Sequence, residues 1–315
     1  MNAIFWKEMA DHFGRRRFGL LFGLILIGVI WGTFIMTQEV KGSSQDPDAF
    51  FFLEVFTTQS NRLPNLLFFI SFFGPLISIA LGFDSINSER SQGTLSRVLA
   101  QPVYRDSLFT GKFLAGLTTL VLIMLTLITS ILGLSMFSMG IAPRGEEVVR
   151  LLGFGFVTSA YLGFWLALAM TCSTFLRNTV TSALVSLGTW LFLTFFLALF
   201  IVPNLASFFA PVNEFSTYQG VIRNANMEIW LSRLSPPMLF AEATTILLNP
   251  LQAAVSGTSM IYADLYRSAG VLLQNPISAS QSLQLVWPHI IALISLVAVF
   301  LAASFIKFMR EEIRS

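Results

Sequence analysis

Six long apolar runs, separated by polar segments, account for most of the chain. Each run is close to the roughly 20 residues that a helix needs to cross the hydrocarbon core of a bilayer. The pattern therefore predicts an all-α polytopic membrane protein, with short connections at residues 138–150 and 172–179. Its six membrane-spanning helices are predicted within a single domain, residues 18–315, at residues 18–36, 66–83, 113–137, 151–169, 180–202 and 285–306.

Residues 1–17 form a separate N-terminal element ahead of the first span. The charged side chains of Lys7, Glu8 and Asp11 alternate there with apolar side chains at roughly helical spacing, namely those of Ile4, Phe5, Met9 and Phe13. This pattern predicts an amphipathic interfacial helix that lies on the membrane surface and ends in the basic run 15–17. The alternative is a plain cytoplasmic tail that ends in a stop-transfer charge cluster.

Two features inside the predicted spans affect how helices pack. The first span contains the G-x-x-x-G pattern twice, starting at Gly19 and at Gly28, which either forms a close packing face or arises by coincidence. The second span contains Gly74 followed by Pro75. Because proline removes a backbone donor, a kink is expected there.

The composition supports a membrane protein and excludes several functions. The chain is 55% hydrophobic and 11% charged, with a mean hydropathy of +0.73, whereas soluble domains carry about 25% charge. Its single Cys172 allows no intrachain disulfide, and His12 and His289 are too few for a His/Cys metal cluster. The spans hold almost no charge, which argues against an ion-driven carrier, and the missing catalytic residue sets argue against an intramembrane enzyme.

The charge distribution predicts the orientation. Of the 19 Lys and Arg residues, 12 lie on the side of the two termini and of residues 84–112, and seven lie on the other side. The positive-inside rule places both termini and residues 84–112 in the cytoplasm. Residues 204–283 then form a large outer segment. It is either a lid packed on its own spans or an outer gate or dock for an extracytoplasmic partner.

The central stretch, residues 84–112, is polar and basic and lies between the second and third spans. Gly93 is expected to break the helix that leaves the second span, Thr94 is a good N-cap, and Pro102 ends the short helix between them. The apolar stripe of this helix consists of Leu95, Val98 and Leu99. A helix of two turns is unstable alone in water, so it packs either on the chain's own helix ends or in a groove of another protein.

The central stretch also resembles a known family. From Asp84 to Arg105 it reads D-SINS-ER-SQ-GTL-SRV-LA-QP-VYR, and Gly111-Lys112 follow. This series resembles the signature after the second span in bacterial and archaeal permeases of the ABC-2 type, and LSRLSPPMLFAEATTILLNP at residues 231–250 is similar to a second passage of that family. The resemblance implies that residues 94–101 are a coupling helix docking into a cleft of an ATP-binding subunit. The implied site residues are Glu89, Arg90, Gly93, Thr94, Leu95, Arg97, Leu99, Pro102 and Arg105.

Lys112 does not belong to a phosphate-binding loop of this chain. The pattern G-x-x-x-x-G-K-[ST] requires Gly at position 106 and Ser or Thr at position 113, where Asp106 and Phe113 stand. We therefore expect no ATP site and no cofactor here, and the subunit itself is not an enzyme. For Arg105 and Lys112 the alternative role is ordinary positive-inside anchoring.

The resemblance also implies partners and a location. It implies two copies of a separate ATPase that binds ATP and Mg²⁺, a second permease subunit in a homodimer, the inner membrane of a prokaryote, and an exporter; no nucleic acid is expected to bind. The alternative is a motor-linked maturation factor, which acts on an extracytoplasmic accessory protein without a transported solute.

Overall fold

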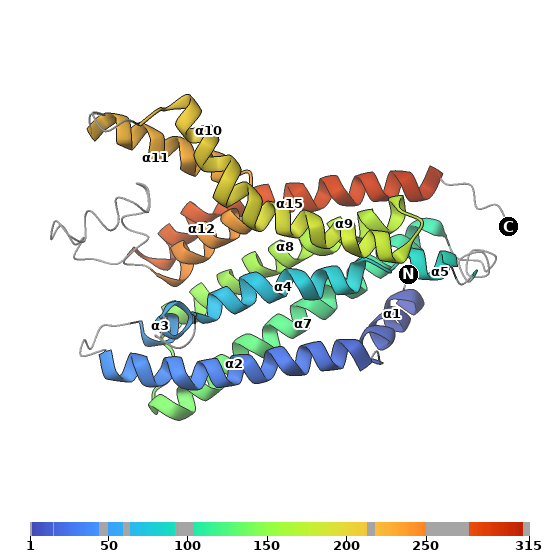
Figure 1. Cartoon of the computed structure of the whole chain (residues 1–315). Helices are drawn as coiled ribbons and strands as arrows, with labels where there is room; N and C mark the ends of the chain where they lie inside the picture. Colours follow the sequence, from blue (N-terminus) through green and yellow to red (C-terminus); the bar gives the residue numbers. More distant parts are fainter. Residues whose placement is uncertain are drawn as a thin grey trace. The chain divides into compact units, whose positions relative to one another are not determined.

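A computed structural model describes residues 2–14, 16–43, 50–58, 64–91, 93, 104–212, 218–249 and 277–310 (Figure 1). Within these residues every regular element is helical. The helices are α1 Asn2–Gly14, α2 Arg16–Ser43, α3 Phe51–Thr57, α4 Leu66–Gly82, α5 Asn87–Ser91, α7 Arg105–Met139, α8 Gly145–Phe175, α9 Thr179–Leu191, the π-helix η1 Phe192–Ile201, α10 Val202–Phe209, α11 Tyr218–Ser232, α12 Pro236–Leu248 and α15 Ala279–Arg310.

Within the described residues, six helical segments are long and apolar enough to cross a membrane, which confirms the predicted all-α membrane protein with six spans. The helices extend beyond most of the predicted runs, and α7 begins at Arg105 rather than at residue 113. The connection predicted at 138–150 covers only residues 140–144 in the structure, and the one predicted at 172–179 covers only residues 176–178. Hydropathy identifies only the part of a helix whose side chains are apolar enough to lie in the hydrocarbon core. At 1.5 Å per residue α7 is about 52 Å long, against about 30 Å of hydrocarbon.

Local side-chain and backbone chemistry sets several helix ends. The side chain of Asn65 accepts a hydrogen bond from the Phe68 amide at 2.9 Å and caps α4. Gly140, with φ of 73°, ends α7 in the left-handed conformation that glycine adopts without strain. Glu147 Oε2 accepts from the Arg144 amide at 2.8 Å, which is half of a capping box at the start of α8.

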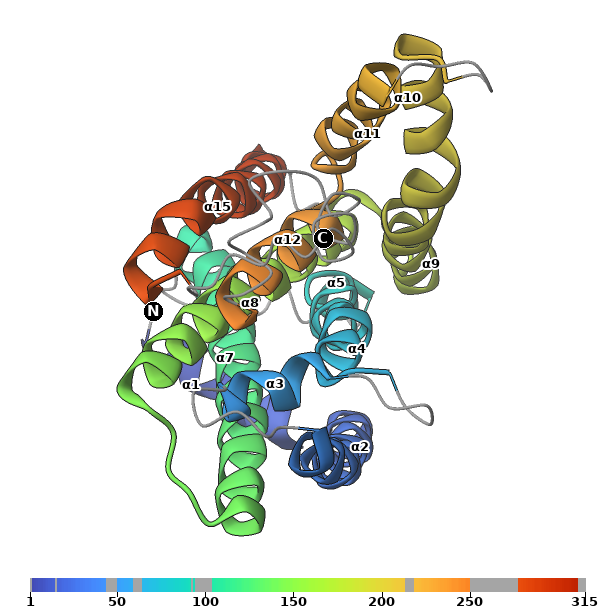
Figure 2. The same ribbon diagram turned by 90° about the vertical axis from the view of Figure 1, so that its left-hand side faces the viewer.

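The described chain forms two compact units. Unit 1 comprises Met1–Pro143, Thr158–Gly188 and Ala292–Ser315, and unit 2 comprises Arg144–Val157 and Thr189–Ile291. In unit 1, α2, α4 and α7 contact one another, and α3 packs on all three (Figures 1 and 2).

Small residues on α4 allow close approach of α8 within unit 1. A Cβ added at Gly74 would lie 2.6 Å from Leu162 Cδ2, and one added at Gly82 would lie 2.8 Å from Ala169 Cβ. The glycines of the first span behave differently: Gly19, Gly23 and Gly28 have no atom within 4 Å of an added Cβ, and only Gly32 meets a neighbour, Leu66. Most of the G-x-x-x-G pattern is therefore not a packing face within the described chain.

In unit 2 the fifth span continues without interruption past its predicted end at residue 202. The π-helix η1 leads directly into α10, which packs on α11 (Figure 1). The Ser235 hydroxyl donates to the Leu193 carbonyl of η1 at 2.9 Å and does not cap α12. Since Pro236 and Pro237 carry no amide hydrogen, the start of α12 requires little capping.

Candidate functional site

A buried ion cluster joins three helices of unit 1 and includes two residues of the central stretch. Nζ of Lys112, on α7, lies 2.8 Å from Oε1 of Glu8 on α1 and 2.7 Å from Oε1 of Glu89 on α5. The three side chains are 4%, 8% and 13% exposed, respectively. Charges removed from water to this extent are stable only when paired. Here one ammonium group is shared by two carboxylates.

The packing of α1 on α7 brings Glu8 to Lys112. A Cβ at Gly111 would lie 3.1 Å from Ile4 Cγ2, so α1 lies close to the α7 backbone. Further along, the Thr119 hydroxyl donates to the sulfur of Met9 at 3.3 Å. The sequence pattern grouped Glu8 with the polar residues of a surface helix, but Glu8 is buried because α7 supplies a cation there. The interfacial location of α1 stays a prediction.

Lys7 and Asp11 form the solvent-facing rim of the cluster. Nζ of Lys7 lies 3.3 Å from Glu8, 3.7 Å from Asp11 and 3.9 Å from Glu89. Its side chain is 58% exposed, so these contacts contribute little stability on their own. They matter for charge balance, because Lys7 and Lys112 together neutralise Glu8 and Glu89.

The pKa shifts of Glu8 and Lys7, both on α1, agree with this geometry. Burial by itself would raise the pKa of Glu8, but the ammonium groups of Lys112 and Lys7 outweigh burial and hold that pKa below its ordinary value. Burial lowers the pKa of Lys7, but the neighbouring carboxylates, Glu8 first, prevail and raise it. Both side chains are therefore charged at neutral pH.

The cluster connects the two arms of the central stretch, which are the segments before and after residues 94–101. Glu89 precedes residues 94–101 and Lys112 follows them, so their contact closes the stretch at its base and attaches it to α1. The arrangement supplies no nucleophile or general base aimed into a cavity. It provides a mechanical connection between the arms and the N-terminal helix.

The structure describes four of the nine predicted site residues. Glu89 belongs to the cluster, Arg90 lies half-buried in α5, and Arg105 is the half-buried first residue of α7. Gly93 has φ of 66° and its amide donates to the Arg90 carbonyl at 3.2 Å, as expected of a chain break. The other five lie outside the described residues, namely Thr94, Leu95, Arg97, Leu99 and Pro102.

Sequence reasoning missed Lys112 and Glu8 as parts of this site. Ordinary positive-inside anchoring is the alternative role for Lys112, yet this residue is buried with the apolar and small residues around it, Leu108, Phe109, Gly111, Phe113 and Ala115. A lysine within such a run requires an acidic partner. That signal was present in the sequence, but it did not identify the partner.

A second polar cluster lies in unit 2. Glu242 of α12 accepts from Nε of Arg233 at 2.9 Å and lies 3.0 Å from Nε2 of His289 on α15. Burial would raise the pKa of Glu242, but the hydrogen bonds from His289 and Arg233 lower it to about 2. Glu242 is therefore ionised across the physiological range and holds α12 to α15.

Arg150 of α8 makes a further connection within unit 2. Its side chain is fully buried, and its guanidinium binds Glu146 Oε1 at 3.0 Å, the Leu247 carbonyl at 3.1 Å, the Ser282 hydroxyl at 2.8 Å and the Ile277 carbonyl. Together with Glu242, this contact fastens α12 to the chain's own span helices, which favours the lid over the dock for this part of the outer segment.

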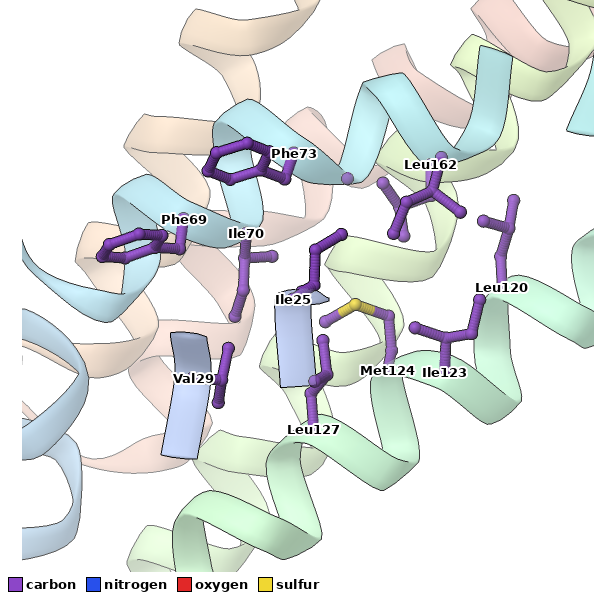
Figure 3. Close-up of a pocket in the computed structure, with 12 residues that line it drawn as sticks. Ile25, Val29, Phe69, Ile70, Phe73, Leu120, Ile123, Met124, Leu127 and Leu162 are labelled. Atoms are coloured by element: carbon purple, nitrogen blue, oxygen red, sulfur yellow. The ribbon is translucent and has the colours of Figure 1, made fainter. Parts of the chain in front are cut away.

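A small cavity in unit 1 lies between α2, α4, α7 and α8 (Figure 3). Figure 3 shows only carbon and one methionine sulfur along its wall, with Val29, Phe73 and Met124 among the lining residues. Its volume of about 10 Å³ is close to the minimum for one water molecule, which would find no polar partner there. Among the described residues no group of three or more His, Cys, Asp or Glu is placed to hold a metal ion.

Comparison with known proteins agrees with this architecture. The family model for ABC-2 family transporter proteins matches residues 2–313, so the chain belongs to that family. A probable ABC transporter permease protein NosY of Pseudomonas aeruginosa is 29% identical over 273 residues, 84% of this chain and 88% of that protein. The probable ABC transporter permease protein NosY of Stutzerimonas stutzeri is 27% identical over 191 residues, 58% of this chain and 63% of that protein.

The family and the six spans define the class of the protein. It is a multi-pass membrane protein and the permease subunit of an ABC transporter. As a permease subunit it is the non-catalytic membrane component, and membership of the family implies association with an ABC ATPase.

Proposed function

We propose that this subunit couples ATP hydrolysis by two copies of a separate ATPase to export of a substrate, as a homodimer in the inner membrane with both termini in the cytoplasm. The ATPase binds ATP and Mg²⁺, and the helix at residues 94–101 docks into it. The site residues are the nine that the family signature implies, from Glu89 to Arg105.

The observation that carries this proposal is the buried contact of Lys112 with Glu8 and Glu89. A docking helix transmits force only if its two ends are fixed to the membrane helices. The cluster fixes both ends at one point and includes α1. Since the motor shifts an equilibrium only through different affinities for two states, a rigid base is needed to convert docking into helix movement.

In the alternative function, the motor acts mechanically on an extracytoplasmic partner and no solute is transported. Both functions require the same coupling site and differ in the cargo.

Replacing Glu89 with Gln is expected to uncouple the motor. The change removes one carboxylate from Lys112 and costs about 1–3 kcal/mol, which corresponds to a loss of roughly 5- to 160-fold in the permease-dependent ATPase rate. Gly93→Pro is expected to do the same, because proline cannot adopt φ of 66° and has no amide to donate to Arg90. The measurement is ATP hydrolysis by the complex in nanodiscs, compared with that of the ATPase alone.

Asp106→Asn is the matched control for Glu89→Gln. Asp106 is an exposed carboxylate in the first turn of α7, and asparagine retains its acceptor for the Ser107 amide. We expect the control to stimulate the ATPase as the wild type does. Wild-type stimulation in Glu89→Gln and in Gly93→Pro, with both proteins inserted normally, would remove the docking assignment.

A further inference from the structure

A turn at residues 83–86, named the elbow, connects α4 to α5. It lies between the second span and Glu89. Helix α4 ends at Gly82, a turn covers residues 83–86, and α5 begins at Asn87. A new helix leaves its first amide groups without partners inside the helix. Ile86 and Asn87 are completely buried, so water does not easily supply the missing acceptors.

Ser173 of α8 supplies them. Its Oγ accepts hydrogen bonds from the amides of Ile86 and Asn87, both at 3.1 Å. Helix starts are usually capped by a serine or threonine of the same turn. Here the capping side chain comes from another membrane-spanning helix, and Ser173 is itself fully buried. The start of α5 is therefore attached to α8.

The carbonyl side of the elbow is attached to α9. The Ser182 hydroxyl donates to the Phe83 carbonyl at 2.8 Å. Ser182 is also buried, and the end of α4 lies so close to α8 that an added Cβ at Gly82 would be 3.0 Å from the Leu166 carbonyl oxygen. Hydrogen bonds on both sides and close packing at Gly82 hold the elbow to two other spans.

We propose that Ser173 and Ser182 are positioning residues, which carry displacement of the central stretch into α8 and α9 as well as into α4. The proposal rests on the coupling function above. Glu89 lies two residues beyond Asn87 on the same short helix, so force applied at Glu89 reaches the elbow within one turn. A packed and hydrogen-bonded elbow moves as a unit with its neighbours and does not deform continuously.

The native Cys172 provides the test. It is the single cysteine of the chain, lies half-buried on α8 next to Ser173, and therefore reports on α8 without an added label site. The rate of labelling by N-ethylmaleimide is measured on the full-length subunit in complex with its ATPase in nanodiscs, with and without ATP. We expect ATP to change this rate about tenfold in the wild type, and Ser173→Ala to lose that change while ATP hydrolysis continues.

Two variants separate positioning from a purely structural role. Ser173→Thr retains the hydroxyl and is expected to restore the ATP-dependent change. Ser78→Ala removes a buried hydroxyl that donates within α4, to the Gly74 carbonyl, and is expected to leave the change intact. A structural role alone would shift labelling equally with and without ATP.

The outcomes distinguish this inference from the proposed function. An ATP-dependent change that survives in Ser173→Ala and Ser182→Ala overturns the elbow assignment. So does the absence of any ATP-dependent change at Cys172 in a wild-type complex whose ATPase rate still depends on Glu89. Loss of Glu89 dependence would instead overturn the coupling function itself.

Discussion

Replacing Lys112 with Met is expected to destabilise the protein by about 3–5 kcal/mol and to abolish permease-dependent ATP hydrolysis. The change leaves Glu8 and Glu89 buried side by side without the ammonium that now lies within 2.8 Å of both. Removing one partner of a buried ion pair is costly because the remaining charge has lost its water and its counter-ion. For a chain of this size we expect the thermal midpoint to fall by roughly 5–15 °C, measured by tryptophan fluorescence of the purified subunit.

Two further variants make this result specific. Lys307→Met removes an exposed lysine on α15 of the same unit, and we expect its thermal midpoint to stay near that of the wild type. Glu8→Gln combined with Lys112→Met removes one charge of each sign and leaves Glu89 with Lys7, so we expect much of the stability to return. A midpoint for Lys112→Met equal to that of Lys307→Met would show that the cluster contributes little.

Arg150→Met is expected to loosen the packing of unit 2 by about 2–5 kcal/mol, because it leaves buried hydrogen-bond acceptors without their donor. Its fully buried guanidinium holds acceptors from three parts of unit 2, so one substitution leaves Glu146 unpaired and frees both Leu247 and Ser282. We expect amide hydrogen exchange to increase at the end of α12 and at the start of α15. Mass spectrometry of the exchanged peptides measures this directly.

Two further variants test whether the effect on exchange is specific to the Arg150 guanidinium, namely Arg150→Lys and the control Arg223→Met. A lysine ammonium cannot reproduce the planar fork that reaches several acceptors, so Arg150→Lys is expected to recover only part of the protection. Arg223 is exposed on α11 of the same unit, and its replacement is expected to leave exchange unchanged. Equal exchange in Arg150→Met and Arg223→Met would contradict the proposed role of Arg150.

The number and order of the spans could be predicted from the sequence, because crossing a bilayer requires about 20 apolar residues wherever it happens. The ends of the helices could not. Residues 105–112 are polar enough to look like a loop, yet they form the first two turns of α7, since α1 packs on them and Glu89 of α5 pairs with Lys112. Hydropathy contains no information about such neighbours.

The candidate site could be predicted only in part, for the same reason. Glu89 and the break at Gly93 followed from local sequence, and the structure describes both. The pairing of Glu89 with Lys112 and Glu8 joins positions far apart in the chain and depends on the packing of α1 against α7. A single sequence shows that a buried lysine needs a carboxylate, but several carboxylates are available.

Small residues illustrate a second limit of sequence patterns. The G-x-x-x-G pattern of the first span is conspicuous, but an added Cβ at Gly19 or Gly28 meets nothing. Gly74 and Gly82 of α4 are eight residues apart and make the close approach to α8. Spacing alone predicts that helices are able to approach. The partner helix decides where they do.

The elbow between α4 and α5 connects these observations to function. Its amides are capped by Ser173 and its carbonyl is bound by Ser182, so α4, α8 and α9 meet at the membrane end of the coupling arm. The ion cluster around Lys112 fixes the other arm to α1. We therefore propose that docking of the ATPase at residues 94–101, between these two anchors, acts on several spans at once.

Photo-crosslinking from position 97 tests the central claim most directly. Benzoylphenylalanine is placed at Arg97 in the intact cell, with the same group at the exposed Asn226 of α11 as the control. We predict a crosslink from position 97 to an ATP-binding subunit and none from position 226. Labelling of position 97 from outside the cell, or crosslinks from it to lipid alone, would contradict the coupling role of the central stretch.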